Sequence, residues 1–360
     1  MSEFFQFLLE YGLFFAKVAT FVIAAIIIVV AVQSNQGAAD SSGRLEVKKL
    51  NDRFEQMESS LRDVMLEPDA AKRWAKEQKE AQKVKAKEAK KLAKQDSKKG
   101  AETSTAESKN IYVLDFDGDM KASAVENFRE EISTVLTMAS SLDEIVVRLE
   151  SPGGMVHSYG LASSQLARIK SAGIPLTICV DRVAASGGYM MACIADKILA
   201  APFAVIGSIG VVASLPNFNK VLKKFDVDYE LLTAGEYKRT LTMLGENTEA
   251  GRKKFIQDLE QTHDLFKGFV SQYRPSLDIS AVATGETWYG QKALENQLVD
   301  GLSTSDEYIA QCVKDAAVYE VKFVQKKSWQ EKIGMSAQAA IENSLDKVLN
   351  KALHDWTTRH

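Results

Sequence analysis

Serine, glycine and lysine residues in a few short segments of this chain have the types and spacing that nucleophilic catalysis requires. The segment DRVAASGGYMMAC, residues 181–193, places Ser186 after a strand-like stretch and before two glycines. Such glycines let the backbone turn sharply and aim N–H groups at one point, which a developing oxyanion needs. The same letters are also typical of an ordinary turn, so the motif alone leaves both interpretations open.

Two further glycine turns accompany this one. The segments ESPGGMVHS (150–158) and VIGSIGVV (205–212) also follow strand-like stretches, and the second contains Ser208. In open α/β folds, ligands bind beyond the carboxyl ends of the strands. The three turns are therefore expected to surround one site, with Met155 and Tyr189 as candidates to line it.

A nucleophilic serine needs a base, and the chain offers few candidates. Of its four histidines, only His157 lies near a glycine turn, where an exposed position on a helix's first turn is the simpler interpretation. Lys238 lies between the apolar stretches of LLTAGEYKRTLTMLG (231–245). A lysine acts as a base only when desolvation lowers its pKa from ~10.4 toward neutrality, a cost of roughly 4 kcal/mol. Lys238 would then be partly buried, and spacing alone leaves both bases open.

Alternating strand and helix patterns must position these segments. A capping-box pair, Ser123 and Glu126, predicts the start of one helix, and Gly173 and Pro175 predict the end of another. A long amphipathic helix is predicted over 249–273. Strands are predicted over 111–118, 144–151, 175–181, 196–202 and 229–235. This rhythm predicts βαβ units and a largely parallel sheet, that is, an α/β fold.

The chain before residue 111 and after residue 325 has a different composition. From Tyr11 to Val32 only Lys17 interrupts an apolar stretch of about the ~20 residues that cross a bilayer. The first ten residues lack the basic start of a cleaved signal peptide, so an uncleaved anchor is predicted. The predicted organisation is an anchor (1–36), a linker and Lys/Ala/Glu-rich helical stalk (37–110), an α/β domain (111–325) and an amphipathic helical tail (326–360).

Composition argues against several classes of function. The net charge is -3, and glutamates interleave with the lysines of the stalk, which predicts a solvated spacer rather than a nucleic-acid-binding surface. The three cysteines, Cys179, Cys193 and Cys312, have no metal-ligand spacing, and those at 179 and 193 are expected to be buried. No metal or cofactor is expected.

Taken in order, RLESPGG, DRVAASGGYMMACIADKILAAPFAVIGSIGV and LLTAGEYKRTLT resemble the SppA-like signal peptide peptidases, which are serine proteases with a Ser-Lys dyad. The resemblance covers nearly the whole chain. It implies that Ser186 is the nucleophile, Lys238 the general base and acid, and Ser208 a residue that positions the lysine. It also implies an oxyanion hole formed by the N–H groups of Gly153 and Gly187.

The resemblance further implies a ClpP/crotonase-like superhelix of βαβ units and a homo-oligomer whose active sites lie at subunit interfaces. It places the chain in a bacterial inner membrane with the catalytic domain on the periplasmic side. The positive-inside rule favours the opposite side, because Arg44, Lys48, Lys49 and Arg53 follow the anchor. Gln297 stands where the family usually has glycine, which bears on the geometry of that turn.

The leading hypothesis is a membrane-anchored serine endopeptidase that hydrolyses signal-peptide remnants, membrane-derived or unfolded segments through an acyl-enzyme. One alternative is a crotonase-like acyl-CoA enzyme, which usually relies on a carboxylate; Glu150 is the one glutamate in the glycine turns. The other is a non-catalytic scaffold, against which the complete set of Ser186, Ser208 and Lys238 argues.

Overall fold

The computed structural model describes residues 43–67 and 109–325, together with Lys17 and scattered positions between 69 and 83. The rest of the predicted anchor, most of the Lys-rich stalk and the tail lie outside the described residues. Among the residues that are described, no helix is long and apolar enough to cross a membrane. The unit considered below runs from Leu45 to Phe323.

A seven-stranded sheet forms the centre of this unit, in the order β1-β10-β2-β3-β4-β6-β9. Its strands are β1 (Arg44–Lys49), β10 (Ala317–Val324), β2 (Asn110–Asp117), β3 (Glu144–Glu150), β4 (Leu176–Val180), β6 (Lys197–Ala200) and β9 (Gly301–Leu302). From β10 to β9, each neighbouring pair is parallel. The predicted α/β fold with a largely parallel sheet is confirmed.

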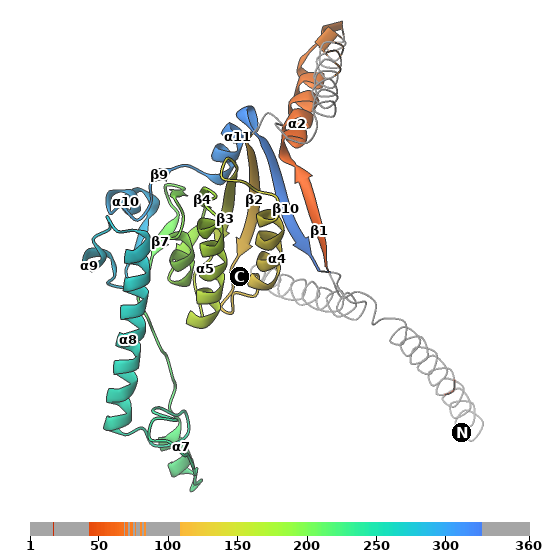
Figure 1. Cartoon of the computed structure of the whole chain (residues 1–360). Helices are drawn as coiled ribbons and strands as arrows, with labels where there is room; N and C mark the ends of the chain where they lie inside the picture. The colour runs from red at the N-terminus through yellow and green to blue at the C-terminus, as the bar shows by residue number, and fades with distance from the viewer. Residues whose placement is uncertain are drawn as a thin grey trace, which may run out of the picture. The chain divides into compact units, whose positions relative to one another are not determined.

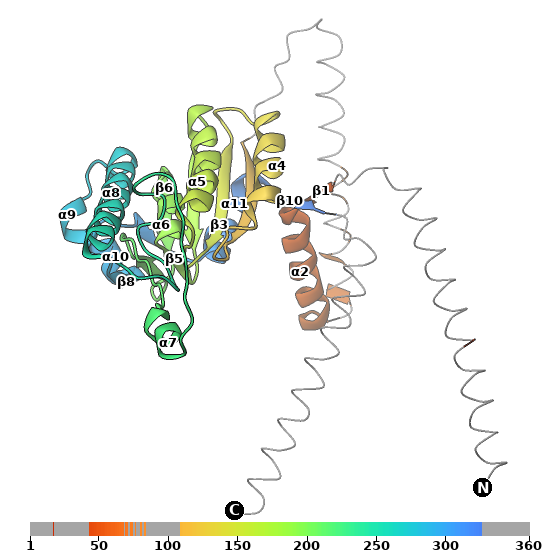
Figure 2. The ribbon, with the colours of Figure 1, turned by 90° about the horizontal axis from the view of Figure 1, so that it is seen from below.

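Helices cover both faces of the sheet, because successive side chains of a strand point to opposite faces. Ile145 and Val147 of β3 pack in the larger core cluster with α4 and α5, whereas Val146 packs in a second cluster with α2 and α11. The helices are α4 (Val125–Leu136), α5 (Val156–Ser171), α2 (Leu50–Met65) and α11 (Ser305–Asp315). Figures 1 and 2 both show α4 and α5 side by side on one face.

A smaller sheet contains the two strands that lead into the Ser186 and Ser208 turns. Its order is β5-β7-β8, with β5 and β7 parallel and β7 and β8 antiparallel. The strands are β5 (Val183–Ala185), β7 (Val205–Gly207) and β8 (Thr287–Tyr289). The remaining helices with their bounds are α6 (Gly187–Ala192), α7 (Asn219–Lys224), α8 (Glu249–Tyr273), α9 (Ile279–Val282) and α10 (Gly290–Glu295). A bridge between Ser151 and Ala184 joins the end of β3 to β5.

The predicted strand over 229–235 is wrong. It lies in the arm, which we define as residues 211–248 between β7 and α8, and there α7 is the one helix or strand. The sheet position beside β6 is taken by β9 instead. Residues with strand propensity do not form a strand when no neighbouring strand pairs with their backbone N–H and C=O groups.

The predicted capping box is also wrong, whereas two other helix boundaries are confirmed. Helix α4 begins at Val125, and the Ser123 hydroxyl donates to the Asp119 carboxylate at 2.8 Å instead of capping the helix. Helix α8 spans the predicted 249–273. Helix α5 ends just before Gly173, which takes the left-handed conformation with φ 71°.

Candidate active site

Ser186 lies between β5 and α6 in a backbone conformation that serine rarely adopts. Its φ is 52° and its ψ is -117°. The Ser186 N–H donates to the Gly207 carbonyl at 2.8 Å, and its carbonyl accepts from the Met190 N–H at 2.9 Å. Strained residues of this kind persist only where surrounding contacts determine them, and they gather at functional sites.

The loop from Ser151 to Gly154 packs directly against this turn. A Cβ atom on Gly153, whose φ is 88°, would lie 2.7 Å from the Ser186 Cβ and from the Gly187 nitrogen. A Cβ atom on Gly187 would lie 2.3 Å from the Tyr159 ring. Only glycine fits at either position, because both contacts are far shorter than van der Waals distance.

The third glycine turn joins the same site. Ser208 follows β7 with φ 54°, and its N–H donates to the Glu286 carbonyl at 2.6 Å. The preceding residue, Gly207, accepts the Ser186 N–H. The expectation that the three turns surround one site is confirmed.

A cavity of about 430 Å³ opens beside Ser186. Each of the three turns contributes one glycine to the walls: Gly154, Gly187 and Gly210. Helix α8 contributes Leu265, Phe266 and Phe269. None of the described residues that line the cavity has a charged side chain. The cavity therefore suits an uncharged, largely apolar group placed next to the serine hydroxyl.

The predicted lining residues are wrong. The Tyr189 side chain is fully buried and its hydroxyl donates to the Leu298 carbonyl at 2.9 Å, while Met155 is exposed and outside the cavity. Their neighbours Met190 and Gly154 line the cavity instead. The wall from α8 had a sequence signal, the amphipathic pattern of that helix, but the pattern does not say which element the helix packs against.

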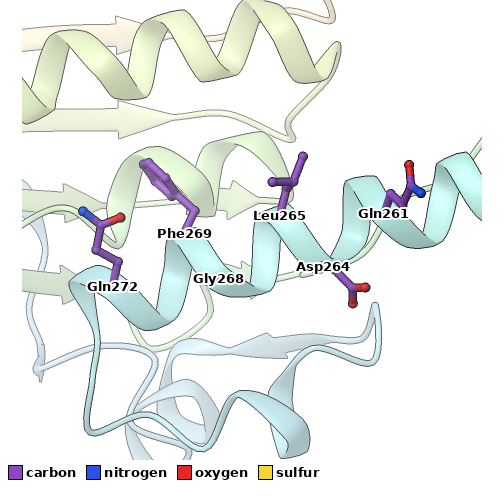
Figure 3. A pocket seen from close by; sticks show the side chains of 6 residues that line it. All are labelled: Gln261, Asp264, Leu265, Gly268, Phe269 and Gln272. Atoms are coloured by element: carbon purple, nitrogen blue, oxygen red, sulfur yellow. The ribbon is translucent and has the colours of Figure 1, made fainter.

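A second hollow adjoins the Ser186 cavity along α8. It is lined by Gln261, Asp264, Leu265, Gly268, Phe269 and Gln272 of α8 (Figure 3). Leu265 and Phe269 line both hollows. Figure 3 shows these two side chains on one side of the helix and Asp264 pointing away from them.

Lys238 is not brought to Ser186 within one chain. It is exposed in the arm, and its neighbours Tyr237 and Arg239 border a hollow formed with the first turns of α8, up to Gln257. The Ser186 cavity contacts α8 from Thr262 onward. Figure 1 shows α7 and the arm at the far end of α8 from the sheet. The burial expected of a lysine base is absent from the single chain.

The N–H group of Gly153 is already occupied. It donates to the Ser151 hydroxyl oxygen at 3.1 Å, so it can hold an oxyanion only if that bond breaks. Gly154, the next residue, lines the cavity beside Ser186 and Gly187. The assignment of Gly153 stays a prediction, and Gly154 is a second candidate for the same role.

The remaining candidates for acid–base or metal chemistry lie elsewhere. Glu150 pairs with Arg182 at 2.9 Å and lines no part of the Ser186 cavity, which disfavours the carboxylate-dependent acyl-CoA alternative. His157 is exposed on the first turn of α5, as the simpler interpretation predicts. In the described parts of the chain, no three His, Cys, Asp or Glu side chains are arranged to hold a metal ion.

A parallel α/β sheet with a serine on a strained turn at the head of a helix is an arrangement found in hydrolases. Two family models match the chain: Peptidase family S49 N-terminal over residues 6–166 and Peptidase family S49 over residues 168–319. The chain belongs to peptidase family S49, and the resemblance to the SppA-like peptidases is confirmed. The junction between the two models falls inside α5, so it is not a structural boundary.

Individual relatives agree with this assignment. The chain is 50% identical, over 96% of its length and 97% of the relative, to "Probable protease SohB" of Haemophilus influenzae. It is 47% identical to the protein of that name from Buchnera aphidicola subsp. Schlechtendalia chinensis, covering 84% of this chain and 99% of that one.

Among solved structures, a lysine mutant of the 1510-N membrane-bound stomatin-specific protease with a substrate peptide is similar at TM-score 0.38 and 15% identity. The likeness covers 63% of this chain and 96% of that one. Family membership and the named relatives make this chain a protease that acts on peptide bonds.

Proposed function

We propose that this chain is a membrane-anchored serine endopeptidase in which Ser186 is the nucleophile and Lys238 the general base. The observation that carries this proposal is the position of Ser186. It occupies a strained turn between β5 and α6, and it opens onto an uncharged cavity bordered by three glycine turns. A small side chain on such a turn is exposed to substrate while the glycines let backbone N–H groups approach the reacting atoms.

In the proposed reaction, the Ser186 oxygen attacks the scissile carbonyl carbon while the neutral amine of Lys238 takes the hydroxyl proton. The lysine then gives that proton to the leaving amine as the C–N bond breaks, which leaves an acyl-enzyme. Water, deprotonated by the same lysine, hydrolyses the ester and restores the serine. Ser208 positions Lys238, and the oxyanion is bound by the N–H of Gly187 with that of Gly153 or Gly154.

The proposed site forms between copies of the chain, with Ser186 from one and Lys238 from a neighbour. The neighbours of Lys238 border the first turns of α8, whereas the serine cavity of the same chain contacts α8 from Thr262 onward. Lys238 is exposed in the single chain, so another subunit would have to bury it. The arm around it exposes twelve large apolar side chains. An apolar surface of this extent marks a protein interface, so a homo-oligomer with a ClpP/crotonase-like arrangement is the proposed assembly.

The cavity also supports a substrate class. Because its walls carry no charge and include Leu265, Phe266 and Phe269, a peptide with an apolar side chain beside the scissile bond fits best. Signal-peptide remnants, membrane-derived and unfolded segments all supply such side chains. The apolar stretch from Tyr11 to Val32 is the basis for proposing a single-pass membrane anchor. The family resemblance is the basis for proposing the inner membrane and the periplasmic side for the catalytic domain, with the cytoplasmic side as the alternative.

Fluorophosphonate labelling of the full-length, detergent-solubilised protein tests this function, because the probe reacts only with an activated serine. We expect the wild type to be labelled and Ser186→Ala to be unlabelled, with Lys238→Ala slowed by about 10²- to 10⁴-fold through loss of the general base. Ser164→Ala is the matched control, because Ser164 lines the same cavity but donates to the Gly160 carbonyl. Equal labelling of wild type and Ser186→Ala would refute the assignment of the nucleophile.

A further inference from the structure

Two buried hydroxyl groups lie beneath the loop that contains Gly153 and Gly154. Ser151 and Tyr159 are both 0% exposed, and their side-chain oxygens are 2.6 Å apart. The Tyr159 ring is also the surface against which Gly187 packs. The proposed reaction assigns no role to either hydroxyl group.

The direction of the hydrogen bonds follows from the number of protons available. Tyr159 has one hydroxyl proton, which it donates to the Asp119 carbonyl at 2.8 Å. Ser151 must therefore donate its own proton to the Tyr159 oxygen, which leaves a Ser151 lone pair to accept the Gly153 N–H at 3.1 Å. The groups form one chain of hydrogen bonds in which each bond polarises the next.

This chain of hydrogen bonds fixes backbone that glycine alone would leave free. Gly153 has φ 88° and is followed by another glycine, so little in their own chemistry keeps the Gly153 N–H pointing inward. On the far side of the pair, the Met155 N–H donates to the Met120 carbonyl at 2.9 Å. Gly154 lies between these two anchored N–H groups and lines the wall of the Ser186 cavity.

We infer that Ser151 and Tyr159 are positioning residues for the oxyanion hole. By binding the Gly153 N–H, they orient the following peptide so that the Gly154 N–H stabilises the oxyanion that develops on the substrate. This inference rests on the proposed serine-protease function. It assigns both hydroxyl groups an effect on the chemical step and none on the binding of ground-state substrate, because both are fully buried and hydrogen-bonded within the protein, although Tyr159 is one of the residues that line the Ser186 cavity.

Removal of single hydroxyl groups tests the inference in the full-length protein. Tyr159→Phe keeps the ring that packs against Gly187 but breaks the chain of hydrogen bonds, and Ser151→Ala breaks it at the next group. Tyr189→Phe is the matched control. Tyr189 is also 0% exposed and also donates to a backbone carbonyl, that of Leu298 at 2.9 Å, but it has no link to Gly153.

The readouts are the melting temperature, kcat and KM on an internally quenched peptide with leucine before the scissile bond, and the rate of fluorophosphonate labelling. We expect Tyr159→Phe and Tyr189→Phe to lower the melting temperature by similar amounts. Tyr159→Phe and Ser151→Ala should each lower kcat and the labelling rate by about 10- to 100-fold with KM changed less than about twofold, as loss of oxyanion stabilisation does. The double variant should be no slower than the worse single variant, because both act through one N–H group.

Each other outcome counts against the inference. If the wild type is active but Tyr159→Phe and Ser151→Ala match Tyr189→Phe in kcat, the pair is structural and the inference alone fails. A raised KM with unchanged kcat would assign the hydroxyl groups to substrate binding instead. An unlabelled wild type would overturn the proposed function, and the inference with it. Should Tyr159→Phe fail to fold, Ser151→Ala decides between these outcomes.

Discussion

Residues 144–210 and the arm, residues 211–248, differ in where their apolar side chains lie. Strands β3 to β7 and helices α5 and α6 send most of their apolar side chains into the core, with Val156 and Leu161 of α5 exposed, whereas no apolar side chain of the arm is buried. The exposed large apolar residues of the arm are Val212, Leu215, Phe218, Val221, Phe225, Val227, Tyr229, Leu231, Leu232, Tyr237, Met243 and Leu244. The segment with Ser186 thus buries most of its apolar side chains within one chain, and the segment with Lys238 leaves most of its own exposed.

The difference suggests that folding of one chain and assembly of several chains contribute different parts of the site. Strain at Ser186 is sustained by hydrogen bonds and close glycine contacts that a single chain provides. A lysine base needs desolvation, which an exposed arm can obtain only by packing against another surface. Folding would therefore build the nucleophile, and oligomerisation would be needed to activate it.

Mixing two inactive variants gives the largest expected effect. Ser186→Ala and Lys238→Ala should each be inactive alone, but co-expression should produce oligomers in which an intact serine meets an intact lysine from a neighbour. Random mixing in equal amounts places both intact residues at about a quarter of the interfaces, so about a quarter of wild-type activity should return. Peptide hydrolysis by the co-purified mixture is the measurement.

A dyad formed between copies and a dyad formed within one copy give opposite results in this experiment. A dyad formed within one chain cannot be restored by mixing, so activity that stays at the level of the single variants would show that Ser186 and Lys238 act in the same copy. Co-expression of Ser186→Ala with the double variant, which has neither residue, is the control. It must remain inactive, because no copy then supplies the serine.

The contrast between residues 144–210 and the arm also explains how much of the site the sequence predicts. The three glycine turns lie together because β5 and β7 are parallel neighbours and the bridge between Ser151 and Ala184 joins the end of β3 to β5, so the carboxyl ends of all three strands are adjacent. The bounds of α8 follow from its local pattern. The position of Lys238 between apolar stretches makes it a candidate base, but its choice over His157 and the role of Ser208 come from the resemblance, since they depend on contacts that no local pattern encodes.

Two errors have the same origin in tertiary contacts. The segment 229–235 has strand-forming residues, but the arm offers no strand to pair with, so propensity alone does not decide its structure. Tyr189 is a candidate from the sequence to line the cavity, yet helix α6 turns its side chain into the core. Met190, one residue further, faces the cavity instead.

A buried carboxyl group gives the next largest expected effect, and it concerns the core rather than the arm. Glu131 of α4 is 4% exposed, and burial raises its pKa to about 7, although one carboxylate oxygen accepts the Phe323 N–H at 2.7 Å. The unfolded chain ionises this group near its ordinary pKa of 4.5. The free energy of unfolding should therefore fall between about pH 4.5 and 7, by up to about 3 kcal/mol.

Glu131→Gln stays neutral and keeps an oxygen to accept the Phe323 N–H. Its stability should equal that of the wild type near pH 4.5 and exceed it at pH 8, as measured by denaturant unfolding at each pH. Glu126→Gln, on the exposed face of the same helix, should show no such difference. A variant at position 131 that is less stable than the wild type at pH 8 would mean that the ionised carboxylate stabilises the fold.

The smallest expected effect concerns the turn after α10. Gln297, where the resemblance implies a glycine, adopts the left-handed conformation with φ 62°, which is a conformation that glycine also adopts. Its N–H donates to the Leu294 carbonyl at 3.0 Å, and its carbonyl accepts from the Arg274 guanidinium at 3.0 Å. These backbone bonds maintain the conformation against an intrinsic cost of about 1 kcal/mol for a residue with a Cβ atom.

Gln297→Gly should relieve that cost without changing either hydrogen bond, which would stabilise the chain by about 1 kcal/mol. Asn296→Gly, one residue earlier at φ -81°, should instead destabilise it by roughly 0.5–1 kcal/mol, because glycine has no advantage in that conformation. The measurement is the thermal unfolding of both variants and of the wild type, which compares their stabilities. Since the turn lies outside the arm, neither substitution should change the oligomeric state, and a Gln297→Gly variant that dissociates would show that the core and the assembly are coupled here.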